Sequence, residues 1–168
     1  MEAIREHPAM QAELQYNHLI PDQLWNRLVA RVQRDNPLLS KETAEMIMDG
    51  ALGFLKLCAD HPGNGFAPSK MVDIGWHTFL MYTKEYQEFC QRVAGRFIHH
   101  APNDGEVKKT GGMAKTVRFM KKTGTPYDLR IWNIDNLNEC YGGDGGDAGD
   151  DDDGGDECGE CNCGECQD

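Results

Sequence analysis

Apolar side chains recur every three or four positions along the first half of the chain. In PDQLWNRLVARVQRDN, which begins at Pro21, the residues Leu24, Leu28 and Val32 share one helical face. A second periodic stretch follows Ser40, a residue type suited to an N-cap, and stops at HPGNG. The two stretches predict amphipathic helices, and Cys58 falls on the apolar face of the second as a small core residue.

The longest periodic stretch runs from Ser69 to Gly95 and predicts a single helix that Gly95 ends. RFIHHAP follows and predicts a short extended segment that ends at Pro102, because a residue before proline avoids the helical region. The stripe of this helix consists of Val72, Trp76, Phe79, Leu80, Thr83, Tyr86, Cys90 and Ala94. We therefore expect Tyr86 and Cys90 to pack in the core.

A weaker stripe predicts a further helix over residues 106–122, carried by Met113, Thr116, Val117 and Met120. After it, Leu129, Ile131 and Trp132 are expected to dock on the helices. No strand-length run alternates between apolar and polar residues. The sequence predicts an all-α fold, a compact bundle of four to five helices over residues 1–140.

The last 28 residues, 141–168, differ from the rest of the chain in charge. They hold eleven acidic side chains and no Lys or Arg, whereas residues 1–140 hold 17 of each sign. Residues 142–157 contain only Gly, Asp, Ala and Glu, which predicts a disordered acidic tail. A neutral body and an acidic tail give no electrostatic case for binding nucleic acid.

The sequence also indicates where the protein works. No stretch approaches the roughly 20 apolar residues that span a bilayer, and MEAIREHPAM lacks the features of a signal peptide. We expect a soluble cytoplasmic protein without a membrane partner. In a reducing cytosol, the seven cysteines are expected to be thiols or metal ligands.

Four of those cysteines form the pattern C-x2-C-x-C-x2-C at the end of the tail: Cys158, Cys161, Cys163 and Cys166. Four thiolates complete the tetrahedral sphere of structural Zn(II), while Cu(I) or an iron-sulfur centre is a weaker alternative. Because only Asn162 separates the two pairs, a zinc ribbon is excluded and a wrapped peptide would hold the ion. Cys140, Cys90 or a histidine of the body could complete the sphere. The alternative is a tail whose thiols stay free or oxidise.

A second candidate metal site lies in the body and comprises Asp73, His77, His99 and His100. Asp73 and His77 are one helical turn apart, so the pair either serves a metal or decorates a solvated face. Neighbouring side chains of an extended segment point to opposite sides, so only one of His99 and His100 can readily join His77. The alternative places one of these imidazoles in a structural hydrogen bond and the other in water.

Two stretches, WHTFLMYTKEYQEFCQRVAGRFIHHAP and KTVRFMKKTGTPYDLRIWNIDNLNEC, precede the Gly- and Cys-rich end. With it they resemble the small bacterial glycine-rich domain-containing proteins and, more distantly, the N-terminal domain of plant glycine-rich domain proteins. The resemblance covers about residues 68–142. It implies a helical domain with a flexible glycine-rich end, and it groups Asp73, His77, His99 and His100 in one motif. The strongly acidic tail departs from this pattern.

Three functional hypotheses follow from the sequence. The first is a metal-binding protein, with Zn(II) at the tail cysteines, that acts in metal handling or as an accessory protein. The second is a metal-dependent enzyme with the Asp/His site of the body. The third is a module for an unspecified protein partner, with a solubilising tail. The sequence contains no phosphate-binding glycine loop, G-x-S-x-G or H-E-x-x-H, so it assigns no catalytic residue and supports no conventional enzyme.

Overall fold

The computed structural model describes residues 13–100 and 111–132. These residues form one 3-10 turn and six α-helices, and they include no strand. The elements are η1 (Asn17–Leu19), α1 (Asp22–Asp35), α2 (Lys41–Asp60), α3 (Lys70–Leu80), α4 (Thr83–Ala94), α5 (Gly111–Thr123) and α6 (Leu129–Trp132). The predicted all-α bundle is confirmed. Residues 141–168, which the sequence predicts to form a disordered tail, lie outside the described residues.

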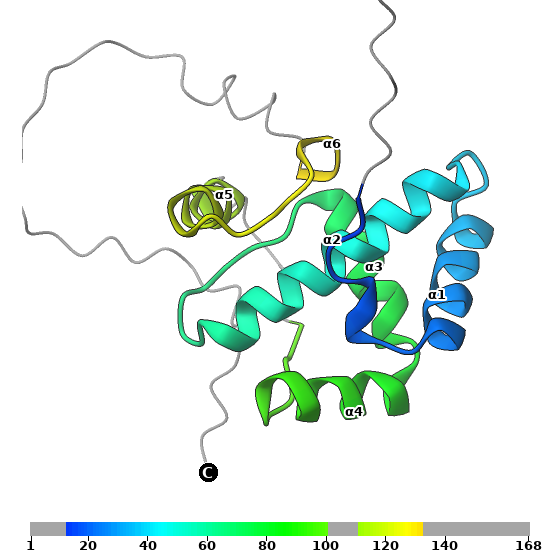
Figure 1. Cartoon of the computed structure of the whole chain (residues 1–168), viewed down its shortest axis with the longest axis horizontal. Helices are drawn as coiled ribbons and strands as arrows, with labels where there is room; N and C mark the ends of the chain where they lie inside the picture. The colour runs from blue at the N-terminus through cyan, green and yellow to red at the C-terminus, as the bar shows by residue number, and fades with distance from the viewer. Residues whose placement is uncertain (1–12, 101–110, 133–168) are drawn as a thin grey trace, which may run out of the picture.

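Helix α2 is the central element, because side chains around nearly its whole circumference are buried. A helix that is apolar on all sides is stable only where other elements surround it. Helices α1, α3, α4 and α6 contact α2, and Figure 1 shows α2 passing through the middle of the molecule. Its largest fully buried side chains are Ile47, Met48, Leu52, Phe54 and Leu55.

One carboxylate within α2 holds the segment that precedes α1. The oxygens of Asp49 accept N–H bonds from Gln15, Tyr16 and Asn17 at 3.0, 2.8 and 2.9 Å. Burial raises the pKa of Asp49, and these backbone bonds act in the opposite direction. Asp49 therefore has a structural role, since it provides acceptors for three backbone donors at the start of the fold.

Helix α3 approaches α2 most closely at Gly75. A Cβ atom at this position would lie 2.8 Å from the Cβ of Ala51 and 2.8 Å from the carbonyl oxygen of Ile47. Side-chain atoms do not tolerate such distances, so the spacing of the two helices depends on the missing side chain. This contact fixes the inner face of α3, and the opposite flank of the helix remains free for other groups.

The single helix predicted over residues 69–95 is wrong, because the chain breaks into α3 and α4 at Met81 and Tyr82. Tyr82 leaves the helical region with φ −98° and ψ 62°, and its N–H bonds the carbonyl of Phe79 at 2.9 Å. Arg27 of α1 lies over the Tyr82 ring at 4.9 Å. These tertiary contacts stabilise a bend that neither glycine nor proline marks in the sequence. One consequence is that Thr83 is exposed instead of lying in the apolar stripe.

The predicted N-cap Ser40 and the predicted helix end at Gly95 are confirmed, and Ser69 is a further cap. The side chains of Ser40 and Ser69 cap α2 and α3 by accepting the N–H groups of Thr43 and Val72. Gly95 ends α4 in the left-handed region with φ 67°, where a residue without Cβ is favoured.

Helices α5 and α6 cover the side of the bundle away from α1 (Figure 1). Thr116 of α5 accepts the N–H of Ala67 at 3.0 Å, and Ser69 donates to the carbonyl of Ile131 at 2.7 Å. Ile131 and Trp132 are buried as predicted, whereas Leu129 is exposed and does not dock. The predicted first turn of α5, residues 106–110, lies outside the described residues.

Across the parts of the chain that the structure describes, no helix combines the length and apolarity needed to cross a bilayer.

The contact at Gly75 can be tested by substitution. Gly75→Ala adds a Cβ where none fits, so α3 must move away from α2, and we expect a loss of about 1–3 kcal/mol in the free energy of unfolding. Urea denaturation followed by circular dichroism measures this loss. Lys70→Ala, at an exposed position of the same helix, is the control. Equal stability of the two variants would contradict the close contact.

Candidate functional site

Asp73 and His77 are presented together by the outer flank of α3. The inner face of this helix buries Val72, Trp76 and Phe79 against the core. Asp73 and His77 are one helical turn apart on the other flank, where 36% and 57% of their side-chain surfaces are exposed. Helical periodicity therefore brings a carboxylate and an imidazole side by side at the surface.

The third member of the site, His100, comes from the extended segment after α4. Ile98 of this segment is buried, and its carbonyl accepts the hydroxyl of Tyr86 at 2.7 Å. The same hydroxyl accepts the indole N–H of Trp76 at 2.9 Å. One buried oxygen thus fastens the extended segment to both α3 and α4.

The bend between α3 and α4 makes this bond possible. Trp76 and Tyr86 are ten positions apart, and on one straight helix that distance is about 15 Å along the axis. Because the chain turns at Met81 and Tyr82, the two side chains meet in the core. The bend that contradicts the predicted single helix is therefore also what positions His100.

Alternation along the extended segment selects His100 over His99. His100 is two residues beyond the buried Ile98 and lies on the same side of the segment, with only 16% of its side chain exposed. Its ring packs edge to face against Trp76 with centroids 4.4 Å apart. His99 is exposed, and its ring contacts Phe97 instead.

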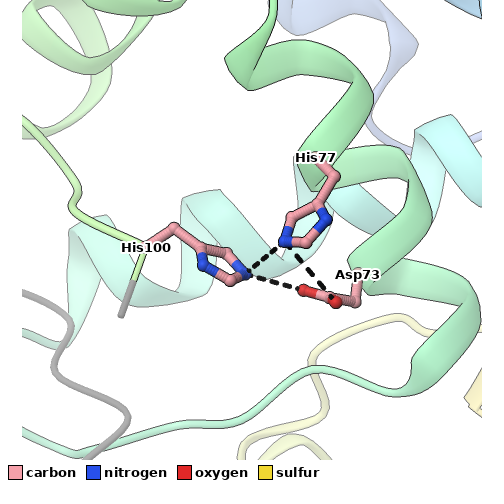
Figure 2. A group of neighbouring side chains, drawn as sticks. All are labelled: Asp73, His77 and His100. Atoms are coloured by element: carbon pink, nitrogen blue, oxygen red, sulfur yellow. Dashed lines mark hydrogen bonds and ion pairs between the residues drawn. The ribbon is translucent and has the colours of Figure 1, made fainter. Parts of the chain in front are cut away.

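Figure 2 shows Asp73, His77 and His100 with their polar atoms turned toward one another. His100 Nε2 lies 2.9 Å from Asp73 Oδ1 and 2.9 Å from His77 Nε2. His77 Nε2 lies 3.8 Å from Asp73 Oδ2. Of the side chains that the structure describes, these three form the group whose ligand-type atoms all lie within 4.8 Å of one another.

Hydrogen bonds alone do not satisfy all of these close contacts. A neutral imidazole carries one N–H, so a hydrogen on His100 Nε2 would have to be shared between Asp73 and His77. If His77 supplies the hydrogen instead, the lone pair of His100 Nε2 faces the carboxylate. A cation placed among the three groups attracts all of them at once, because each offers an electron pair.

The distances also suit a metal ion. Bonds of about 2.0–2.1 Å in a tetrahedral sphere place neighbouring ligand atoms about 3.3 Å apart. The two Nε2 atoms are 2.9 Å apart, and the carboxylate of Asp73 approaches them at 2.9 Å through Oδ1 and 3.8 Å through Oδ2, so the separations lie on both sides of that value. Two imidazoles with one carboxylate form catalytic zinc sites, and the same set forms the facial site of non-haem Fe(II) enzymes. The donor set therefore fits a transition metal with open coordination positions.

Among the residues that the structure describes, the other cysteines and histidines proposed from the sequence lie outside this cluster. Cys58 and Cys90 are fully buried, which confirms their predicted place in the core. Burial raises the pKa of the Cys90 thiol, which disfavours the thiolate form that binds metals. Cys140 and the four tail cysteines, Cys158, Cys161, Cys163 and Cys166, lie outside the described residues.

Sequence reasoning missed the role of Tyr86 in positioning His100. The apolar stripe predicts its ring in the core, which is correct, but says nothing of its hydroxyl. Burial raises the pKa of Tyr86, so the hydroxyl keeps its proton and can donate to Ile98. The available signal was that a buried tyrosine requires a partner for its hydroxyl.

The comparisons with known proteins identify a family. A sequence model of the UCP032817-like family matches residues 10–121, a range that contains Asp73, His77 and His100. Neither the curated proteins nor the solved structures gave a match. The family description names no activity, and no comparison bears on the resemblance to glycine-rich domain proteins, which stays a prediction.

The shared hydroxyl provides a test of how the site is held. Tyr86→Phe leaves the Trp76 indole N–H and the Ile98 carbonyl without their buried partner, so we expect a loss of about 1–3 kcal/mol in unfolding free energy. Denaturant titration measures it. Tyr82→Phe, which removes a hydroxyl outside this network, is the matched control, and a similar loss in both variants would contradict the proposed anchor.

Proposed function

We propose that this chain, which belongs to the UCP032817-like family, binds a transition-metal ion at Asp73, His77 and His100. The observation that carries the proposal is the 2.9 Å separation of the two Nε2 atoms, from His77 and His100, beside a carboxylate. Zn(II) is the first choice of metal, because it accepts imidazole and carboxylate ligands together.

Charge and accessibility support the same proposal. Asp73 supplies one negative charge to two imidazoles, which lowers the cost of bringing in a divalent cation. His77 is the most exposed of the three and leaves the ion a path from solvent, whereas His100 is held by Trp76 and by the segment at Ile98. The site thus combines a fixed ligand with an accessible one, as suits reversible metal handling.

The tail cysteines are proposed as a second, independent site for Zn(II). Their support is the pattern of Cys158, Cys161, Cys163 and Cys166 within an acidic segment, which favours a thiophilic cation. Cu(I) and iron-sulfur centres remain the alternatives for this tail site. A cytoplasmic location, also proposed from the sequence, would keep the four thiols reduced. The chain would then act in metal handling or as an accessory protein.

The body site is tested in the full-length chain with the four tail cysteines replaced by serine. This protein is expected to bind one zinc ion, as measured by calorimetric titration and elemental analysis. His100→Ala removes a ligand and is expected to weaken binding at least about 10–100-fold, the range seen even when an outer-shell partner is lost.

His99→Ala is the matched control, because it removes the neighbouring imidazole, which lies outside the cluster. Zinc binding is expected to be unchanged in this variant. Binding of less than about a tenth of an equivalent by the parent that lacks the four tail cysteines would contradict a body site, since a preformed ligand set should load at pH 7. Equal weakening by His99→Ala and His100→Ala would contradict the proposed ligand assignment.

The number of ligands favours a second candidate function, a metal-dependent enzyme. Three protein ligands leave a coordination position for water or substrate, and zinc lowers the pKa of a bound water to about 7. Asp73, His77 and His100 would hold the ion, and the water or substrate at the open position would react.

The open position can be tested with Co(II) in the protein whose four tail cysteines are replaced by serine. Azide added to this protein should occupy the open position and change the visible spectrum of the ion. The change should be retained in His99→Ala. A spectrum that azide leaves unaltered would argue against the enzyme and leave metal binding itself intact.

A further inference from the structure

Helix α5 carries a continuous positive face. Lys115, Arg118, Lys121 and Lys122 are all exposed, and the sequence of the helix, GGMAKTVRFMKKT, contains no acidic residue. At 100° per residue these four side chains fall within an arc of about 120°. Their charges therefore add on one side of the helix.

The opposite face of α5 attaches to the body. Thr116, Val117 and Met120 are buried there, and Thr116 bonds the backbone of Ala67. In helical projection the buried arc lies roughly opposite the basic arc. The positive face thus points outward on a helix whose other face fixes it to the body.

The cations of α5 differ from those of α1 and α2 in having no acidic partner among the residues that the structure describes. On the two earlier helices, Arg31 pairs with Asp35, Lys41 with Glu45 and Lys56 with Asp60, each one turn away. No ion pair within residues 13–100 and 111–132 involves a cation of α5. Four positive charges on one face, without an ion pair to any described residue, attract an anionic partner.

The same chain supplies a complementary segment. Residues 141–168 carry eleven acidic side chains and no Lys or Arg. They are separated from Trp132, the last described residue of α6, by residues 133–140, which span at most about 28 Å when extended. A tether of this length places the acidic groups at an effective concentration near the millimolar range around the body.

We propose that the acidic tail, residues 141–168, binds the basic face of α5 in the same molecule. The contact is electrostatic, reversible and sensitive to salt, because exposed charges are screened within about 10 Å at 0.1 M ionic strength. Since the tail carries more negative charges than α5 carries positive ones, carboxylates remain near the tail cysteines to attract a cation. The interaction would hold the acidic tail against the neutral body.

Zero-length cross-linking of the full-length protein tests this proposal. A carbodiimide joins a lysine amine to a carboxylate only when the two groups touch, and peptide mass spectrometry identifies the pair. We expect tail carboxylates to couple to Lys115, Lys121 and Lys122 several-fold more than to Lys70 and Lys84. Those two lysines are the controls, because they are also exposed and lie on α3 and α4. In about 1 M salt, where the Debye length is about 3 Å, the preference should disappear.

Three outcomes would overturn the proposal. One is equal coupling of all exposed lysines, which would reflect exposure alone. Another is coupling only between molecules, as revealed by mixing isotopically light and heavy protein. The third is protection of the α5 lysines by an added oligonucleotide in a protein whose tail does not couple to them, which would identify an external polyanion as the partner of this face.

Discussion

A single buried hydroxyl links the parts of this molecule on which its candidate site depends. The hydroxyl of Tyr86 accepts from the Trp76 indole and donates to the Ile98 carbonyl, and a buried donor or acceptor left without its partner costs free energy. The bond requires the chain to bend after α3, and it fixes the extended segment against two helices. The register of that segment, and with it the choice between His99 and His100, follows from where Ile98 is held.

The candidate metal site is a consequence of this constraint. Helix α3 supplies Asp73 and His77 by periodicity alone, while His100 depends on the anchored segment. A helix packed at Gly75 and a segment pinned at Ile98 are rigid supports, so the three ligand-type atoms converge before any ion binds. Such preorganisation lowers the conformational entropy that binding would otherwise cost. Because His77 is exposed and Asp73 is partly exposed, ion exchange with solvent is compatible with the same geometry.

Much of the fold follows from local sequence signals. The periodic stripes predict α1, α2 and the apolar face of α3, and Ser40 and Gly95 mark helix ends. The bend at Met81 and Tyr82 could not be predicted, because tertiary contacts with α1 stabilise it and no glycine or proline marks it. For the site, the i, i+4 spacing of Asp73 and His77 and the alternation at His99 and His100 were readable. The convergence of the two segments was not, since it depends on a hydrogen bond between side chains ten positions apart.

The proposed metal binding at the body site and the proposed docking of the acidic tail can be tested separately, because they involve different groups. The central claim is the ligand set of the body site. X-ray absorption spectroscopy of the zinc-loaded, full-length protein with the four tail cysteines replaced by serine tests it most directly. The account predicts nitrogen and oxygen neighbours at about 2.0–2.2 Å, with the outer-shell scattering of two imidazoles, and no sulfur at about 2.3 Å. A zinc ion bound without two imidazoles, or no bound zinc, would contradict it.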